Sequence, residues 1–319
     1  MTDPGPNTRT LNVVWRRRVL DNFLEASFIR SVLLSGLQRP VLWIAIEDDA
    51  DLPLLDDMLV CSFGDPGAYI RQLRAAGHLN IGIFHLGDET GQDDRAFYAS
   101  ADYVLRHYWT ADDEDAFGDA RDIGTWVPNG WATGVGPGTT EPQIPFLERT
   151  HDIFFAGFAG NSQATINERA MMLDALRENR VPATVILSDG FGQGLGTVSY
   201  AAYMRDSKLA LVPGGNAPET IRFYDALECG AIPVILDGSW LHSAKAAGAL
   251  GAPPVITLRS WAEIADVAAF LHPPETAREL SERADACRAW WNRFKHHTAN
   301  RTAEIIEASF NRFMPDRSS

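Results

Sequence analysis

Residues 207–236 read SKLALVPGGNAPETIRFYDALECGAIPVIL, a pattern of apolar runs and turns that defines a fold class. An apolar run over 209–212 leads into a Pro-Gly-Gly turn, a helical pattern follows, and a second apolar run occupies 232–236. Short apolar runs on either side of a helix are typical of neighbouring strands in a parallel sheet, with the helix as their crossover. The stretch therefore predicts an α/β protein.

The turn in this stretch has the chemistry of a phosphate site. Gly214 and Gly215 let the backbone approach a ligand closely, and the helix that follows begins with free N–H groups that favour an anion. Arg222, in the first turn of that helix, carries a planar guanidinium that can clamp a diphosphate. An ordinary strand–helix turn with a solvated arginine contains the same residue types, so the residues alone leave both interpretations open.

The same alternation of strands and helices extends along most of the chain. Predicted strands lie at 11–15, 41–46, 58–62, 81–85, 103–106, 153–156, 184–187, 209–212, 232–236 and 255–257. Predicted helices lie between them, at 19–35, 66–76, 93–100, 163–179, 197–206, 219–229, 239–247 and 262–271. This order favours βαβ units and parallel sheets.

The length and one unusual stretch predict two domains. A chain of 319 residues suits two domains, and residues 129–145 are dense in Gly, Pro and Thr, which indicates a connection between them. We expect Rossmann-like domains over 1–145 and 146–275, facing a cleft at the carboxyl ends of their strands, where such folds bind ligands. Residues 276–319 are predicted to form C-terminal helices, broken near 297–299, that pack back across both domains.

Composition excludes several classes of protein. The chain has 28 Lys and Arg against 42 Asp and Glu, a net charge of −14, which argues against a nucleic-acid partner. Cys61, Cys229 and Cys287 are far apart, so neither a disulfide framework nor a zinc site is indicated. No signal-peptide pattern or membrane-spanning apolar run is visible. We expect a cytoplasmic protein with no transmembrane segment, for which peripheral contact with a membrane stays open.

Within 207–235, the order S-K-x-x-L-x-P-x-G and then E-T-x-R-F-x-D-A-L-x-x-G-x-I-P-V-I resembles the C-terminal domain of exostosin-like glycosyltransferases. Upstream, the strand at 153–156 with Gly157 and Arg169 is similar to the element that opens this domain. The segments 81–89, 103–109 and 127–130 resemble the N-terminal half of bacterial members. Two residues depart from the family pattern: Asp225 stands where the family has Glu, and Ala231 where it often has Cys.

The resemblance implies a two-domain GT-B fold. In that fold the C-terminal domain binds a nucleotide-diphosphate sugar, here expected to be UDP- or GDP-linked, and the N-terminal domain binds a glycan, lipid-linked or small-molecule hydroxyl acceptor. The donor is a substrate, and neither a cofactor nor a metal is expected.

The resemblance also implies roles for single residues at the donor site. Arg222 and Thr220 would hold the diphosphate with Arg169 as a further candidate, Asp225 would reach the ribose, and Glu219 would lie near the transferred sugar. The expected donor-site residues are Gly157, Arg169, Ser188, Gly214, Gly215, Glu219, Thr220, Arg222 and Asp225.

The catalytic base is expected in the N-terminal domain, as in inverting members of the fold. Transfer to a hydroxyl needs a general base, and the segment IGIFHLGDE over 81–89 places His85, Asp88 and Glu89 at the end of a buried strand. Carboxyl ends of strands are where α/β folds place their chemistry. The sequence does not choose among the three, and a core histidine beside an acidic helix start would look the same. Arg106 and His107 end the next strand and are candidates for binding acceptor or phosphate.

Other functions fit parts of the sequence. The segment VLWIAIEDDAD over 41–51 places Asp49 and Asp51 after a strand, as in the D-x-D that holds Mn²⁺ or Mg²⁺ in metal-dependent GT-A transferases. A nucleotide-sugar epimerase of the same fold and a non-enzymatic sugar-binding protein are further alternatives. Whether a hexose or a pentose is moved, and with retention or inversion, stays open.

Overall fold

The structure is a computed structural model that describes residues 9–17, 24–47, 52–108, 122–136, 144–160, 167–190, 193–238, 241 and 250–313. The chain divides into two compact units. Unit 1 comprises residues 1–26, 30–128 and 296–319, and unit 2 comprises residues 27–29 and 129–295. Each unit is built on one sheet of parallel strands, so the predicted α/β class with two Rossmann-like sheets is confirmed.

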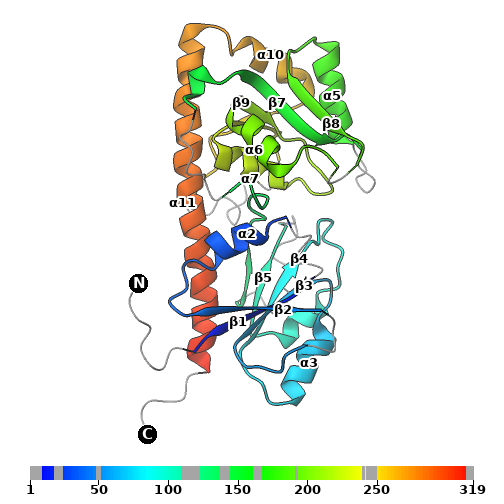
Figure 1. Ribbon diagram of the computed structural model, residues 1–319, viewed down its shortest axis with the longest axis vertical. Helices are drawn as coiled ribbons and strands as arrows, with labels where there is room; N and C mark the ends of the chain where they lie inside the picture. The colour runs from blue at the N-terminus through cyan, green and yellow to red at the C-terminus, as the bar shows by residue number, and fades with distance from the viewer. Residues whose placement is uncertain are drawn as a thin grey trace. The chain divides into compact units, whose positions relative to one another are not determined.

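Unit 1 contains a six-stranded parallel sheet in the order β2-β1-β3-β4-β5-β6 (Figure 1). Its strands are β1 (Leu11–Arg16), β2 (Val41–Ile46), β3 (Met58–Phe63), β4 (Ile81–Leu86), β5 (Tyr103–Arg106) and β6 (Gly124–Trp126). Strand β4 is buried along its whole length, between β3 and β5, because its residues are apolar on both faces. The carboxyl end of β4 therefore lies in the middle of the sheet edge, between the ends of β3 and β5.

Two helical layers cover this sheet. Helix α3 (Gly67–Ala75) and the 3₁₀ turn η3 (Ala96–Ser100) bury apolar side chains against strands on one side. The last part of α11 (Pro274–Arg312) supplies the other contacts, with Ser309 donating to the buried Asn80 at 2.7 Å and Arg39 paired with Glu307. Near the start of the chain lie a short α2 (Ala26–Phe28) and a π-helical turn η1 (Ile29–Leu33), of which residues 27–29 belong to unit 2.

Unit 2 contains a five-stranded parallel sheet in the order β11-β10-β9-β7-β8 (Figure 1). Its strands are β7 (His151–Phe158), β8 (Thr184–Ser188), β9 (Ser207–Leu211), β10 (Ile232–Leu236) and β11 (Ile256–Leu258). The chain leaves β7 toward β8 and returns to pair β9 on the other side of β7. The strand order thus reverses between β7 and β9, and doubly wound sheets bind ligands at such a reversal.

The helices of unit 2 form two groups, α6 with α7 and α5 with α10. They are η5 (Phe146–Glu148), α5 (Glu168–Glu178), α6 (Thr197–Arg205), α7 (Ile221–Cys229), η7 (Trp261–Glu263) and α10 (Ile264–Ala269). Thr220 is the N-cap before helix α7, and Gly230 is the residue after it, in the left-handed conformation that closes many helices. The strand–turn–helix–strand order predicted for 207–236 is confirmed.

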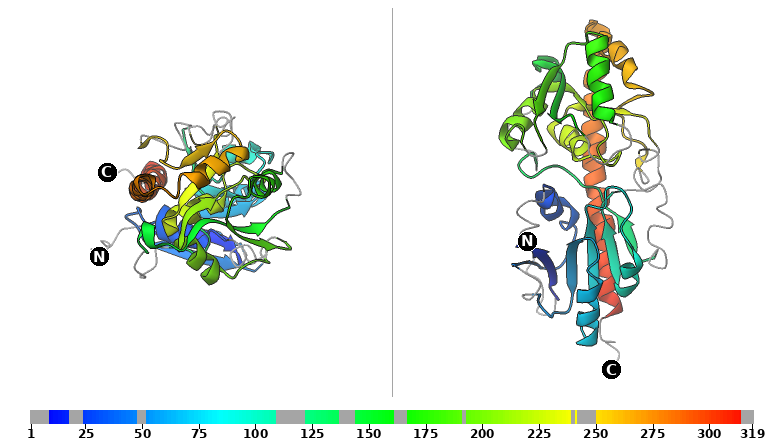
Figure 2. Two further views of the ribbon diagram at one scale, coloured as in Figure 1. Left: turned by 90° about the horizontal axis from the view of Figure 1, so that it is seen from above. Right: turned by 90° about the vertical axis from the view of Figure 1, so that its right-hand side faces the viewer.

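The C-terminal tail differs from the prediction. Residues 274–312 form one uninterrupted helix, seen nearly end-on in the left view of Figure 2, with no break near 297–299. The segment contains no Gly, and its only Pro is its first residue, Pro274, where a helix tolerates proline. Thr298 and Ala299 are buried, so packing compensates for the low helix propensity of threonine. Residues 274–295 of this helix belong to unit 2, and the remaining residues belong to unit 1.

The first boundary between the units falls after Pro128, where we expected it near 145. Residues 129–136 belong to unit 2 because they pack on it. Trp131 is buried and lies edge-on to Phe28 with centroids 4.7 Å apart, and the Ala132 amide donates to Asp225 at 2.8 Å. Glycine and proline mark the stretch as irregular, but burial decides the unit to which it belongs.

Local elements also differ in extent. Strand β6 was not predicted, because its residues, Gly-Thr-Trp, contain no apolar run. Within the described residues, the helices expected at 19–35 and 93–100 are reduced to short turns, and the one expected at 239–247 lies almost wholly outside them. No helix of the described residues is long and apolar enough to span a membrane.

Candidate functional site

In unit 2, the Gly-Gly turn after β9 lies beside the carboxyl end of β7, at the reversal of strand order. The amide of Gly215 donates to the carbonyl of Ala217 at 3.0 Å, which closes the turn. A Cβ added to Gly215 would lie 3.2 Å from Nη2 of Arg169 and 3.8 Å from Cγ2 of Thr220. The turn, the start of α5 and the start of α7 therefore meet at one place.

Two arginines occupy this place. Arg222, the second residue of α7, donates from Nη2 to the Ala156 carbonyl at 3.0 Å, and its guanidinium lies over the ring of Phe155. Arg169, the second residue of α5, donates from Nη1 to the Phe158 carbonyl at 3.0 Å. Because the two carbonyls are two residues apart on β7, both guanidinium groups gather at the end of that strand.

Gly157 lies between those carbonyls and is required there. Its φ of +148° is rarely adopted by residues with a side chain, and a Cβ would lie 2.6 Å from Nη2 of Arg222. Among the described residues, Nε of Arg222 and Oγ1 of Thr220 are buried without a hydrogen-bond partner. Buried polar groups are normally paired, so these two donors are available to a ligand.

The structure adds Glu168, which the sequence did not single out. Its carboxylate accepts from the Gly214 amide and, at 3.1 Å, from Nε1 of Trp261. Burial raises the pKa of Glu168, although these hydrogen bonds and the nearby Arg169 act in the opposite direction. The amides of Gly214 and Gly215 are thus both paired, with Glu168 and with the Ala217 carbonyl, and Gly215 lies next to Arg169. No sequence signal marked Glu168, because its contacts come from elements distant along the chain.

The two carboxylates expected at the donor site, Glu219 and Asp225, do not lie beside the arginine pair. Glu219 is buried and accepts from the Asn129 amide at 3.2 Å and from the Tyr224 hydroxyl at 2.8 Å. Asp225 is buried as well and accepts from the Ala132 amide and, at 3.2 Å, from the Tyr200 hydroxyl.

Both carboxylates therefore hold the segment 129–132 rather than lining the arginine pair. Burial raises the pKa of Asp225 to about 7. Ser188, at the end of β8, donates its hydroxyl to the Gly190 carbonyl at 3.0 Å.

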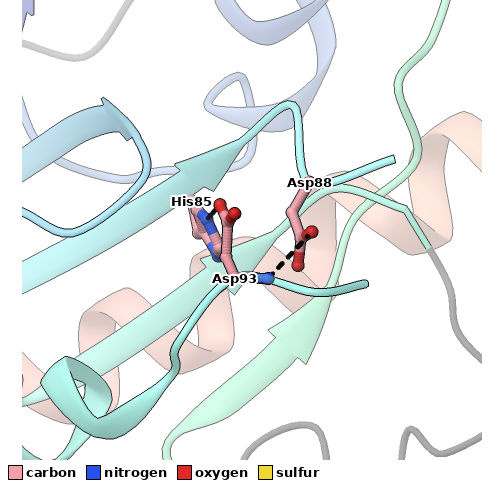
Figure 3. Close-up of side chains that lie close together, drawn as sticks. All are labelled: His85, Asp88 and Asp93. Carbon is pink, nitrogen blue, oxygen red and sulfur yellow. Dashed lines mark hydrogen bonds and ion pairs between the residues drawn. The ribbon is translucent and has the colours of Figure 1, made fainter. Parts of the chain in front are cut away.

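In unit 1, a second polar cluster lies at the carboxyl end of β4 (Figure 3). His85 is buried, with Nδ1 2.6 Å from the Tyr98 hydroxyl and 3.1 Å from Nη1 of Arg106. Its Nε2 lies 3.0 Å from Oδ2 of Asp93. Burial and the positive charge of Arg106 lower the pKa of His85, so the imidazole is neutral at pH 7.

Asp88 is the second acidic member of this cluster. It is buried and accepts from Nη2 of Arg106 at 2.6 Å, and its other oxygen accepts from the amides of Gln92 and Asp93. Burial alone would raise the pKa of Asp88, but the hydrogen bond and charge of Arg106 outweigh it and the pKa is lowered. Asp88 therefore stays charged and holds the loop.

The remaining expected residues of unit 1 take different positions. Glu89 is half-buried and accepts from the Tyr108 hydroxyl at 3.3 Å. His107 is buried edge-on to Phe84, and burial lowers its pKa to about 3. Phe63, at the end of β3, is 48% exposed and its ring lies over Gly87.

Ligand atoms of His85, Asp88 and Asp93 lie within 4.8 Å of one another, close enough to hold a metal ion. The guanidinium of Arg106 already contacts two of these residues and supplies the positive charge that a cation would bring. A divalent ion would have to displace it, so the set fits a metal poorly. The D-x-D residues Asp49 and Asp51 lie outside the described residues.

Two domain models match the chain. The exostosin GT47 domain matches residues 129–245, and the RXYLT1 C-terminal domain matches residues 194–311. Together they span nearly all of unit 2 and part of α11, and residues 1–128 lie outside both. No curated protein matches the chain.

Solved structures show the fold. Sucrose-phosphate synthase from Thermosynechococcus elongatus is 12% identical with a TM-score of 0.54, covering 94% of this chain and 100% of its own. A trehalose-phosphate synthase from Burkholderia vietnamiensis is 13% identical with a TM-score of 0.53, covering 84% and 76%. A putative UDP-N-acetylglucosamine 2-epimerase from Listeria monocytogenes is 12% identical with a TM-score of 0.51, covering 96% and 98%.

Fold and matched domains together define a class: a glycosyltransferase of the GT-B fold. The matched residues, 129–311, are similar to domains of the exostosin-like glycosyltransferase family. The resemblance carried by residues 207–235 is thereby confirmed, and sugar transfer is the general activity that this family defines.

Proposed function

We propose that this chain transfers a sugar from a UDP- or GDP-linked sugar to a hydroxyl of a glycan, lipid-linked or small-molecule acceptor. Unit 2 binds the donor and unit 1 binds the acceptor. One observation carries the proposal: the guanidinium groups of Arg169 and Arg222 gather at the carboxyl end of β7, beside the Gly-Gly turn and at the reversal of strand order. Planar guanidinium groups bind phosphate oxygens through paired hydrogen bonds.

The guanidinium groups of Arg169 and Arg222 also stabilise the transition state of sugar transfer. When the bond between sugar and diphosphate breaks, negative charge grows on the leaving diphosphate, and fixed cations lower the energy of that state. Nε of Arg222 and Oγ1 of Thr220 are buried donors without partners in the described residues, so a phosphate there would satisfy them. A protein with a net charge of −14 needs such a local concentration of positive charge to bind an anionic donor.

The carboxyl edge of unit 1 suits an acceptor with hydroxyl groups. Phe63 offers a half-exposed ring, and sugar rings stack on aromatic faces through their C–H groups. Asp93 and Glu89 offer carboxylate oxygens that accept hydrogen bonds from hydroxyls.

Calorimetric titration with UDP and GDP tests the donor site. Both Arg222→Ala and Arg169→Ala are expected to raise the Kd of the bound nucleotide about 10- to 100-fold, since each removes charge-assisted hydrogen bonds. Arg177→Ala is the matched control, because Arg177 lies on α5 and, among the described residues, forms an ion pair with the exposed Asp174 alone.

Two results would contradict the proposal. One is the absence of binding by UDP, GDP or their sugars to the wild-type chain. The other is epimerisation of a nucleotide sugar, seen by NMR, without release of the nucleotide to any acceptor.

A further inference from the structure

The polar cluster of unit 1 holds one residue, Asp93, in a position that its structural contacts alone do not require. We propose that Asp93 is the base that takes the proton of the acceptor hydroxyl, and that His85 is a positioning residue that orients its carboxylate. The inference rests on the proposed function, because it presupposes a bound nucleotide sugar. It departs from the sequence prediction, in which His85, Asp88 and Glu89 were the candidates.

Arg106 determines which nitrogen of His85 carries the proton. An arginine has only donors, so Nη1 of Arg106, 3.1 Å from Nδ1 of His85, requires a lone pair on Nδ1. The proton of the neutral imidazole is therefore on Nε2, where it is donated to Oδ2 of Asp93 at 3.0 Å. The only lone pair of His85 points to Arg106 and Tyr98, so His85 cannot itself take a proton from a substrate.

Asp93 is held at two points. His85 fixes its carboxylate, and Asp88 accepts from its backbone amide at 3.3 Å, as the dashed lines in Figure 3 show. Asp88 is in turn fixed by Arg106. One buried arginine thus orders both supports of the same residue.

Exposure separates Asp93 from its neighbours in the cluster. The side chains of His85, Asp88 and Arg106 are 0%, 2% and 0% exposed, whereas that of Asp93 is 42% exposed. A base must come within hydrogen-bond distance of the hydroxyl that it deprotonates. Of His85, Asp88 and Asp93, the last alone meets this requirement without rearrangement.

The step that this arrangement supports is a single displacement. The acceptor O–H bond breaks and its proton passes to a carboxylate oxygen of Asp93, while the acceptor oxygen bonds to the anomeric carbon of the donor sugar. The bond between that carbon and the diphosphate breaks, and the diphosphate leaves with the electron pair. A base on the acceptor side implies inversion at the anomeric carbon.

The test uses Asp93→Asn in the full chain, with Asp94→Asn as matched control. Asp94 is the exposed neighbour in the same loop, and its carboxylate accepts only from the Ala96 amide among the described residues. Release of UDP or GDP from UDP- and GDP-sugars is measured with water and with hydroxyl acceptors. We expect Asp93→Asn to lower kcat by at least about a hundredfold, with an unchanged Kd for UDP or GDP, and Asp94→Asn to match the wild type.

Variants of His85 separate positioning from folding. His85→Gln keeps an amide N–H near the place of Nε2 and is expected to retain kcat within about tenfold, while His85→Leu falls as far as Asp93→Asn. Both should leave the nucleotide Kd unchanged, a readout that does not depend on unit 1.

The outcomes distinguish the two proposals. If neither UDP nor GDP binds the wild type, the proposed function fails and the role of Asp93 fails with it. If nucleotide binds but Asp93→Asn turns over the donor at the wild-type rate, or the product keeps the donor's anomeric configuration, the role of Asp93 is overturned and the donor site stands.

Discussion

At the carboxyl end of β7 in unit 2, Arg169 and Arg222 are partly exposed, whereas the carboxylates Glu219 and Asp225 of the same unit are buried against the segment 129–132. At the carboxyl end of β4 in unit 1 the order is reversed, since Arg106 is fully buried and Asp93 is exposed. The two edges use the same residue types, yet one presents positive charge and the other negative charge. Which member of each set is buried therefore decides whether an edge suits a diphosphate or a hydroxyl.

The buried aspartates of the two units differ in the same way. Asp88 is paired with Arg106 and its pKa is lowered, because that hydrogen bond and charge outweigh the effect of burial. Asp225 accepts from an amide and a tyrosine hydroxyl, and burial raises its pKa to about 7. Lowering the pH therefore reduces the stability that Asp88 contributes to unit 1, whereas raising the pH reduces the stability that Asp225 contributes to unit 2.

The largest effect is expected from Arg106→Leu. The substitution leaves Asp88 buried and charged without its cation, and removing one partner of a buried ion pair costs about 3 to 5 kcal/mol. Urea unfolding followed by tryptophan fluorescence measures the loss. Arg71→Leu, on the exposed side of α3, should change the free energy of unfolding by no more than about 0.5 kcal/mol. Equal losses of unfolding free energy in both variants would show that the buried Arg106–Asp88 pair does not stabilise the fold more than an exposed arginine does.

Asp225→Asn is expected to change how stability depends on pH. The folded chain keeps the proton of Asp225 up to about pH 7, whereas an unfolded aspartate loses it near 4, so the wild type loses stability as pH rises between these values. The difference corresponds to at most about 4 kcal/mol. Asparagine does not titrate and still accepts from the Ala132 amide.

Urea unfolding at pH 5 and pH 8 checks this expectation. From pH 5 to pH 8, the free energy of unfolding of Asp225→Asn should rise relative to that of the wild type. Asp174→Asn, at an exposed site, should follow the wild type. A parallel pH dependence in all three chains would mean that Asp225 is ionised in the folded protein.

The smallest effect is expected from Gly157→Ala. A Cβ there meets Nη2 of Arg222 and strains a backbone with a φ of +148°, so the guanidinium should move from its place and the nucleotide Kd rise about tenfold. Calorimetric titration with UDP and GDP measures it. Gly196→Ala is the control, because no atom of the described residues lies within 4 Å of the added Cβ, and Gly196 is the N-cap that precedes α6. An unchanged Kd in Gly157→Ala would separate the position of Arg222 from nucleotide binding.

Much of unit 2 was predictable because its determinants are local. The apolar runs, the glycine turn and Gly230 lie within thirty consecutive residues, and each follows from strand pattern, turn chemistry or helix termination. The short β6 and the unbroken α11 were not predictable in this way. The residues of β6, Gly-Thr-Trp, contain no apolar run, and the helix continues through Thr298 because burial stabilises it.

The residues of the two sites also fall into those that the sequence predicted and those that it did not. Gly157, Arg169 and Arg222 were expected from the residues and the family resemblance, and the structure brings them together. Asp93 and Glu168 were not, because an aspartate in a loop and a glutamate at a helix start are common and solvated in most proteins.

By itself the sequence determined the class of fold, the place of the glycine turn and the presence of an arginine at the start of the helix that follows. These follow from hydrophobic period and turn chemistry, which act over a few residues. Tertiary structure alone decided which charges are buried. That choice depends on contacts between distant residues, such as Arg106 with Asp88 and Ala132 with Asp225, and burial sets both the pKa of a group and its access to a substrate.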